Sequence, residues 1–434
     1  MFTAARYIAI DDDRTELGAL VDALHAIGAP CIGIQFNPQA LPDPELFKGL
    51  RILITDLNLV KGVPNGEIHY NTIASIIDTC VPDHHGPFVV VLWTSHEHER
   101  DALTARLDAV LPPEKKPLAV LALDKNQYRD GDAWKAPELQ QDIRQKLSES
   151  AQLSALLSWE RDVLGASNAT LSLLGSLVPP ADRTPAGYPA ALDRILSLLA
   201  TAAAGVEGGA KNPRSAVSAA LAPLLADRIL NQSDDAGASE LWTKAVTFPA
   251  GGHLTKEQKA SMNRMLHFAV PPSETVANAD WGAVTPLGPK QLTDDAMKKR
   301  FGATAEQLLK DEFRVHPDKL KDGQLVLLRV GAVCDQAQVN AGPIPTLLGV
   351  LVPTASLNNS KRPGPAVLKC PEEILLKEAD GPLSLLVNAR FPTSLVTADF
   401  EEWPAAILRV REQLLMTILV HSATHVMRPG TLSF

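Results

Sequence analysis

Residues 88–95 read FVVVLWTS, an apolar run that stops at two hydroxyl residues. Its length and its β-branched content predict a buried strand at 88–93. Three further runs have the same character and also stop at polar residues: RYIAI at 6–10 stops at Asp11, Asp12 and Asp13, RILIT at 51–55 stops at Asp56, and LAVLAL at 118–123 stops at Asp124 and Lys125. Each predicted strand therefore ends where a side chain with acid–base or ligand chemistry begins.

Segments with helical spacing separate these strands. Apolar residues at 17, 20, 21, 24 and 27 predict a helix after the first strand, and 31–36 predicts a second strand. Helices are also predicted around 73–77, over 103–110 and from Pro137 onward. Strands that alternate with helices form parallel sheets through right-handed crossovers. The first 150 residues therefore predict an α/β fold with a doubly wound, five-stranded parallel sheet.

The polar residues at the strand ends are expected to lie together. In an open parallel sheet, binding sites form at the edge where the strands have their carboxyl ends. The residues that would converge there are Asp11, Asp12, Asp56, Thr94 and Lys125. Carboxylates can hold a divalent cation, and a hydroxyl and an ammonium group can hold phosphoryl oxygens. The sequence thus predicts a magnesium-dependent site that accepts a phosphoryl group.

With these residues in this order, the first 150 residues resemble the receiver domain of two-component response regulators, a flavodoxin-like fold. The resemblance implies that Asp56 is phosphorylated by a partner histidine kinase. It implies contacts from Thr94 and Lys125 to the phosphoryl group. It also implies a Mg²⁺ site formed by Asp11, Asp12, Asp56 and the backbone carbonyl of Asn58.

Two positions depart from the receiver pattern. Receivers usually have proline after the lysine, whereas here Asn126 follows Lys125. Many receivers also have a Tyr or Phe in the fifth strand that moves with the threonine, and here that stretch reads Leu121, Ala122 and Leu123. The resemblance therefore covers the phosphorylation chemistry but not the usual aromatic switch.

The rest of the chain predicts two further regions, since 434 residues exceed one ordinary core. Ala- and Leu-rich segments at 192–204, 216–230, 239–246 and 254–268 predict a helical domain at 151–310. Short apolar runs at 325–333, 346–352, 366–369 and 383–389 predict a β-rich domain at 311–434. A helix from Pro404 to about Met427 is expected to close that domain. The helix from Pro137 is expected to continue, with a break, into the helical domain.

Composition limits the function classes. Lys and Arg total 41 against 50 for Asp and Glu, a formal net charge of −9, so nucleic acid is not an expected partner. The four cysteines, Cys31, Cys80, Cys334 and Cys370, have no CxxC spacing and predict neither disulfides nor a zinc site. Without a leader or a run of about 18 uninterrupted apolar residues, we expect a cytoplasmic protein that does not associate with membranes.

The output of such a protein is expected to be protein contact, because no enzymatic or DNA-binding motif is legible beyond residue 150. Residues 327–335 and 428–430 are similar to large receiver-like proteins of bacterial two-component operons, including those of phage-defence type. This resemblance implies an adaptor or a phosphate sink that competes with a second receiver for the kinase. Oligomer formation remains open.

An alternative class uses some of the same residues. Asp11-x-Asp13-x-Thr15 fits the opening motif of haloacid-dehalogenase-like phosphatases, with Thr94, Lys125 and Asp130 or Asp132 as later motifs. That hypothesis leaves Asp56 without a role. The tripeptide HisProAsp at 316–318 matches J-domain co-chaperones, but a strand is predicted after it instead of a helix. The pairs His96/His98 and His421/His425 have metal-compatible spacing without a third ligand, so a solvated surface is the preferred interpretation.

Overall fold

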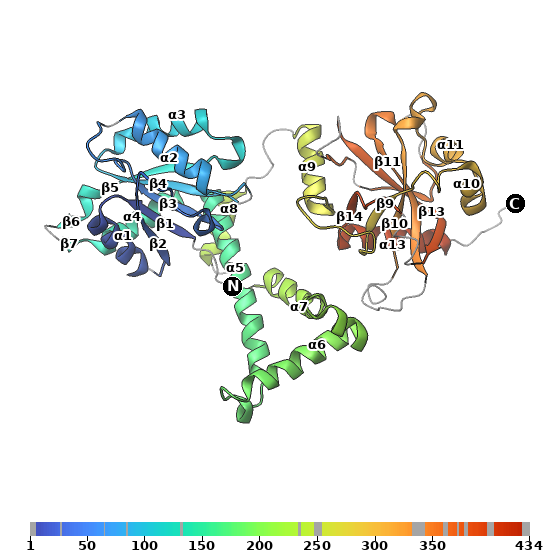
Figure 1. The fold of residues 1–434 in the computed structure, drawn as a ribbon, viewed down its shortest axis with the longest axis horizontal. Coiled ribbons are helices and arrows are strands. Elements are labelled where there is room, and N and C mark those ends of the chain that lie inside the picture. Colours follow the sequence, from blue (N-terminus) through green and yellow to red (C-terminus); the bar gives the residue numbers. More distant parts are fainter. Residues whose placement is uncertain are drawn as a thin grey trace. The chain divides into compact units, whose positions relative to one another are not determined.

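The structure of the protein is a computed structural model (Figure 1) that describes residues 6–26, 28–64, 66–83, 86–130, 133–232, 236–246, 254–331, 343–358, 363–370, 373–376, 381–396 and 403–427. The chain forms two compact units. One comprises Met1–Gly165 and Gln232–Ala250, and the other comprises Ala166–Asn231 and Gly251–Phe434.

The first unit contains the predicted five-stranded parallel sheet. Its strands are β1 (Tyr7–Asp11), β2 (Cys31–Gln35), β3 (Ile52–Asp56), β4 (Val89–Thr94) and β5 (Ala119–Asp124), in the order β2-β1-β3-β4-β5. All four neighbouring pairs are parallel. The fold class expected from the sequence is confirmed, and each strand starts within two residues of its predicted start.

Helices cover both faces of this sheet (Figure 1): α1 (Arg14–Ala26), α2 (Glu67–Cys80), α3 (Arg100–Val110) and α4 (Ala136–Ser148). Side chains alternate between the two faces, so Leu53 joins one core cluster while Ile52 and Ile54 join the other. Burial on both faces explains why β3 and β4 are continuously apolar. Each such aliphatic side chain contributes roughly 1.5–3 kcal/mol when fully buried.

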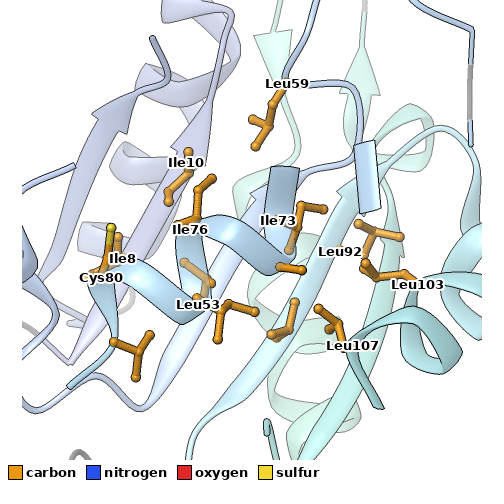
Figure 2. Close-up of a cluster of buried hydrophobic side chains, with 14 of the residues drawn as sticks. Ile8, Ile10, Leu53, Leu59, Ile73, Ile76, Cys80, Leu92, Leu103 and Leu107 are labelled. Atoms are coloured by element: carbon orange, nitrogen blue, oxygen red, sulfur yellow. The ribbon is translucent and has the colours of Figure 1, made fainter. Parts of the chain in front are cut away.

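Figure 2 shows the core on the side of α2 and α3. Its labelled strand residues include Ile8, Ile10, Leu53 and Leu92, and its labelled helix residues are Ile73, Ile76, Cys80, Leu103 and Leu107. On the opposite face, α1 and α4 supply Leu17, Leu20, Leu139 and Ile143. This packing on both sides fixes the sheet and the strand ends that carry the polar residues.

Short elements complete the first unit: η1 (Pro44–Phe47), η2 (Glu97–Glu99), η3 (Pro113–Lys115), η4 (Lys125–Tyr128), and a hairpin of β6 (Arg129–Asp130) and β7 (Ala133–Trp134). The helix α5 (Ala151–Ser176) follows α4 after a two-residue break, as predicted. The unit also includes α8 (Ala236–Ala245).

An ion cluster fixes α5 to the amino end of the sheet. Arg51, just before β3, donates through Nε and Nη2 to the two carboxylate oxygens of Glu160, at 3.1 Å and 2.9 Å. Arg6, just before β1, also forms an ion pair with Glu160. The carboxylate therefore has two arginine partners, and both of them come from residues beside strand starts.

Two helices follow α5 and a short turn, η5 (Pro180–Asp182). They are α6 (Tyr188–Lys211), interrupted at Gly205 with φ 70°, and α7 (Pro213–Leu230), whose amino end Asn212 caps. Their shared core is small and consists of Ala200, Ala204 and Ala216. Within the described residues, α6 is the one helix whose length and composition would allow it to cross a membrane, and 17% of its apolar window is buried. The expectation of no membrane association stays a prediction.

The second unit also contains a seven-stranded antiparallel sheet in the order β12-β13-β11-β10-β9-β14-β8. Its elements in chain order are α9 (Lys256–His267), β8 (Phe268–Ala269), β9 (Ala283–Pro286), α10 (Asp294–Phe301), α11 (Ala305–Gln307), the π-turn η6 (Leu308–Glu312), η7 (Pro317–Asp322), β10 (Gln324–Arg329), β11 (Ile344–Pro353), η8 (Thr354–Ser356), β12 (Val367–Lys369), β13 (Leu383–Leu395), β14 (Leu408–Val410) and α13 (Glu412–Val426). The helix α13 packs on one face of the sheet, and α10 and η6 pack on the other. The predicted β-rich region with a C-terminal helix is confirmed.

Two details of this region differ from the sequence prediction. The strands β8 and β9 were not predicted and come from residues assigned to the helical domain. The last helix begins at Glu412 instead of Pro404, because 408–410 pair with β9 and β8 as strand β14. The tripeptide at 316–318 lies at the start of η7, which leads into β10, so the strand predicted after it is confirmed and the helical context of a J-domain is absent there.

Candidate functional site

The predicted site residues lie at the carboxyl ends of four adjacent strands. Asp11 ends β1, Asp56 ends β3, Thr94 ends β4, and Lys125 follows β5 directly. Asp12 follows β1, and carboxylate oxygens of Asp11, Asp12 and Asp56 all lie within 4.8 Å of one another. The sheet thus brings together three acidic side chains that are separated by up to 45 positions in the sequence.

Two of these carboxylates are almost completely buried, Asp11 at 1% exposure and Asp56 at 3%. Oδ1 of Asp11 accepts the backbone N–H of Asp13 at 2.8 Å, whereas Oδ2 is buried and has no hydrogen-bond partner among the described residues. Burial raises the pKa of Asp11 to about 7, and the negative charge of Asp56 adds to this shift. Ionising Asp11 in the metal-free protein is therefore costly.

Asp56 has more partners than Asp11. Its Oδ2 accepts the backbone N–H of Asn58 at 3.0 Å, and its Oδ1 accepts a hydrogen bond from Lys125 Nζ at 3.3 Å. Burial nevertheless raises the pKa of Asp56, because desolvation outweighs the Lys125 charge and the Asn58 hydrogen bond. The sequence prediction for Asn58 concerned its backbone carbonyl, whereas the hydrogen bond in the structure is made by its backbone N–H.

The acidic cluster fits a hard divalent cation such as Mg²⁺. Such ions prefer carboxylate and carbonyl oxygens as ligands. The unpartnered Asp11 Oδ2 is a buried oxygen that needs a positive partner, and Asp12 and Asp56 supply further oxygens nearby. Among the described residues, no other group of three or more His, Cys, Asp and Glu side chains lies close enough to hold a metal ion. Asp11, Asp12 and Asp56 are thus the candidate metal ligands.

Lys125 lies between two carboxylates, one of which the sequence analysis missed. Its Nζ is 2.7 Å from Glu16 Oε2 and 3.3 Å from Asp56 Oδ1. Burial lowers the pKa of Lys125, but the charges of Asp56 and Glu16 together raise it, so the side chain stays an ammonium ion. Glu16 stands in the first turn of α1, just after the acidic turn, and this placement was the only signal in the sequence.

Thr94 is completely buried at the end of β4. Its Oγ1 accepts the backbone N–H of His96 at 3.1 Å, which orders the loop that follows the strand. The strand β4 lies between β3 and β5, so Thr94 stands on the strand between those that carry Asp56 and Lys125. All the candidate residues are thus at the same sheet edge.

An aromatic pair lies next to Thr94, although β5 has no aromatic residue. The rings of Trp93 and Tyr128 stack with centroids 5.6 Å apart. Tyr128 is in the turn η4, three residues after Lys125, and its hydroxyl donates to Asp142 of α4 at 2.8 Å. No local sequence pattern indicates this pair, because the two residues are not adjacent in the sequence.

The residues of the phosphatase alternative are arranged differently. Asp13 is exposed, and its Oδ1 accepts the backbone N–H groups of Thr15 and Glu16 at 2.7 Å and 3.2 Å. These hydrogen bonds lower the pKa of Asp13. Asp13 thus caps α1 and is not a member of the acidic cluster, and Asp132 lies outside the described residues.

The other metal candidates from the sequence have no third ligand in the described part of the chain. His96 and His98 make an edge-to-face ring contact with centroids 5.8 Å apart, and His421 is hydrogen-bonded to the carbonyl oxygen of Ala366. Cys31, Cys80 and Cys370 are free thiols, and Cys334 and the tripeptide at 428–430 lie outside the described residues.

No protein-family model matches this chain, and no curated protein matches it. The five-stranded parallel sheet with a buried aspartate cluster at its carboxyl edge fits a receiver-like fold.

Proposed function

We propose that this protein is a receiver-type signalling protein whose Asp56 accepts a phosphoryl group from a partner histidine kinase in a Mg²⁺-dependent reaction. The observation that carries the proposal is the position of Asp56, a buried carboxylate with oxygens of Asp11 and Asp12 within 4.8 Å and the ammonium group of Lys125 at 3.3 Å. A carboxylate in such a place has both a cation site and a donor for phosphoryl oxygens.

The chemistry follows from these neighbours. An Asp56 oxygen forms a bond to phosphorus while the phosphorus–nitrogen bond of the kinase phosphohistidine breaks. The electron pair of the broken bond leaves with the imidazole, which takes up a proton from solvent. Mg²⁺, held by Asp11, Asp12 and Asp56, would offset the negative charge of the phosphoryl oxygens. Lys125 would donate to one of these oxygens, and the Thr94 hydroxyl would donate to another.

Asp56→Asn tests this function most directly. Wild-type protein incubated with Mg²⁺ and either a labelled kinase or acetyl phosphate is expected to incorporate phosphate that hydroxylamine releases, as acyl phosphates do. Asp56→Asn is expected to incorporate none. Asp13→Asn, a matched change at the exposed helix cap, is expected to retain labelling. Equal labelling of Asp56→Asn would contradict the proposal.

The same proteins separate the receiver from the phosphatase alternative. A receiver is not expected to release phosphate catalytically from small phosphomonoesters. Steady turnover that Asp11→Asn abolishes and Asp56→Asn leaves intact would instead assign the phosphatase mechanism, with Asp11 as the nucleophile.

For the output, we propose protein contact in the cytoplasm, as an adaptor or as a phosphate sink in a two-component pathway, with antiphage defence as its setting. A sink needs only the phosphorylation chemistry, whereas an adaptor also needs two states with different partner affinity. The test reconstitutes the kinase, this protein and a second receiver. A sink drains label from the kinase and protects the second receiver, and Asp56→Ala removes the protection. Equal protection by the variant would exclude a sink.

A further inference from the structure

Lys125 is shared unequally between two carboxylates. Its Nζ lies 2.7 Å from Glu16 Oε2, an ideal separation for a charge-assisted hydrogen bond, and 3.3 Å from Asp56 Oδ1. The Glu16 and Lys125 side chains are only 14% and 17% exposed. Solvent therefore screens this pair much less than it screens a surface ion pair. In the unphosphorylated protein, the better partner of Lys125 is Glu16.

Glu16 occupies a fixed position. Its backbone N–H donates to the Asp13 carboxylate, and α1 is packed on the sheet by Leu17 and Leu20, one and four residues after Glu16. Lys125, by contrast, has a long side chain with four rotatable carbon–carbon bonds. A change in the relative charge of Asp56 and Glu16 will therefore move the ammonium group and not the glutamate.

We propose, on the basis of the function proposed above, that Glu16 is a positioning residue. It holds Lys125 back from Asp56 until a phosphoryl group is present. Phosphorylation replaces the single charge of the Asp56 carboxylate with up to two negative charges on the phosphoryl oxygens. These charges outweigh the single charge of Glu16, so Lys125 transfers to the phosphoryl oxygens. Glu16 thus lowers the affinity of the site for a phosphoryl group and raises its affinity for the cation.

The two effects have opposite signs for a simple electrostatic reason. Glu16 adds one negative charge near Asp11, Asp12 and Asp56, and it keeps the positive charge of Lys125 away from Asp56. Both contributions favour binding of Mg²⁺. The same negative charge repels phosphoryl oxygens and competes with them for Lys125. If Glu16 had a merely structural role, substituting it would weaken the binding of Mg²⁺ and of phosphoryl oxygens together.

Glu16→Gln separates these roles, because glutamine keeps the size and the acceptor oxygen but removes the charge. We expect the affinity for Mg²⁺ alone to fall about fivefold and the affinity for beryllium fluoride, at saturating Mg²⁺, to rise about fivefold. Beryllium fluoride stands in for the phosphoryl group on Asp56. Calorimetric titration measures the first quantity and fluorine NMR the second. Glu45→Gln is the matched control, since Glu45 also pairs with a lysine, Lys48, but on the surface.

A double-mutant cycle tests the route through Lys125. In a Lys125→Met background, Glu16→Gln should leave beryllium fluoride binding within twofold of the single Lys125 variant, because the competition for the ammonium group is gone and only the weaker direct repulsion by Glu16 is left to remove. A Glu16 effect of full size in that background would overturn the positioning role.

The outcomes also distinguish this inference from the proposed function. If the wild-type protein binds neither Mg²⁺ nor beryllium fluoride, the receiver function and this inference both fail. If the wild type binds both but Glu16→Gln shifts the two affinities in the same direction, or shifts neither by twofold, the function stands and the role of Glu16 is refuted.

Discussion

Carboxylates at the two ends of the five-stranded sheet have different partners and opposite pKa shifts. At the carboxyl end, Asp11 and Asp56 are buried beside Asp12, and the partly buried Lys125 is 3.3 Å from Asp56. At the amino end, the single carboxylate of Glu160 has two arginine partners, Arg6 and Arg51. Burial raises the pKa of Asp11 to about 7. Burial also acts to raise the pKa of Glu160, but the arginine hydrogen bonds and charges lower it overall.

The difference distinguishes an ion cluster that stabilises the fold from a cluster that is suited to bind a ligand. The charge of the partly buried Glu160 carboxylate is balanced by its two arginine partners, so it needs no further ligand. A buried carboxylate oxygen with no partner lowers the stability of the fold, and such groups are typical of ligand-binding sites. The opposite pKa shifts predict opposite responses to mutation, pH and metal, which the following experiments measure.

The largest expected effect is on metal binding. Asp11→Asn replaces a charged candidate ligand with a neutral one, so the dissociation constant for Mg²⁺ should rise by roughly a hundredfold. Glu160→Gln, at the other end of the same sheet, should leave it unchanged. Calorimetric titration of both variants measures this, and a Glu160 effect as large as the Asp11 effect would remove the distinction between the two ends.

The next effect concerns stability without metal. The native state keeps a proton on Asp11 up to about pH 7, whereas the unfolded chain releases it near pH 4. The native state therefore binds more protons between these pH values, and stability falls as the pH rises through this window. Asp11→Asn should remove this loss and stabilise the metal-free protein by about 2 kcal/mol at pH 8.

Chemical denaturation in a chelator at pH 5 and pH 8 provides the measurement. Between pH 5 and pH 8, the wild type should lose more stability than Asp11→Asn does. Addition of Mg²⁺ at pH 8 should restore the stability of the wild type but not that of the variant. A variant that is less stable than the wild type at pH 8 would show that Asp11 is needed for the fold.

At the amino end, the sign reverses. The lowered pKa of Glu160 means that its ion cluster contributes stability above the unfolded pKa of about 4.5 and loses it as the pH falls through the lower native pKa. Glu160→Gln should cost about 1 kcal/mol at pH 7, a value that allows for screening of the partly exposed cluster. The difference from the wild type should disappear at low pH. A cost that persists unchanged at pH 2 would indicate a packing effect instead.

The smallest effect comes from the geometry of the arginine pair. Arg51 donates to both oxygens of Glu160, a two-point contact that lysine cannot make. Arg51→Lys keeps the charge and should cost about 0.5 kcal/mol, less than Glu160→Gln. Thermal unfolding of the two variants side by side gives the order. A larger loss for Arg51→Lys would mean that Arg51 acts mainly through its contact with the Leu50 carbonyl.

The sequence was sufficient for the parallel sheet and for the polar edge. Each of the quoted strands is a continuous apolar run that stops at a polar residue, so Asp56 and Lys125 could be assigned to strand ends from local information alone. Topology then placed those ends together. The phosphorylation role given to these residues stays a prediction.

What could not be predicted depends on contacts between distant residues. Glu16 and Lys125 are 109 positions apart, as are Arg51 and Glu160, so no local pattern marks either pair. The strands β8 and β14 have two and three residues, too few for an alternating pattern, and exist because neighbouring strands complete their hydrogen bonds. Residues 406–410 were assigned to the last helix because the strands that pair with 408–410 could not be identified from local sequence.

The stacked pair of Trp93 and Tyr128 gives the molecule a built-in optical probe. The Trp93 indole is fully buried, one residue before Thr94 and in ring contact with the turn that carries Lys125. A buried indole emits at shorter wavelength than an exposed one, and its emission responds to nearby charges. Ligands that change the charge around Lys125 should therefore change the emission of this one indole among the six in the chain. A Trp93→Phe difference spectrum would isolate that signal, and events at the sheet edge could be followed in real time without any attached label.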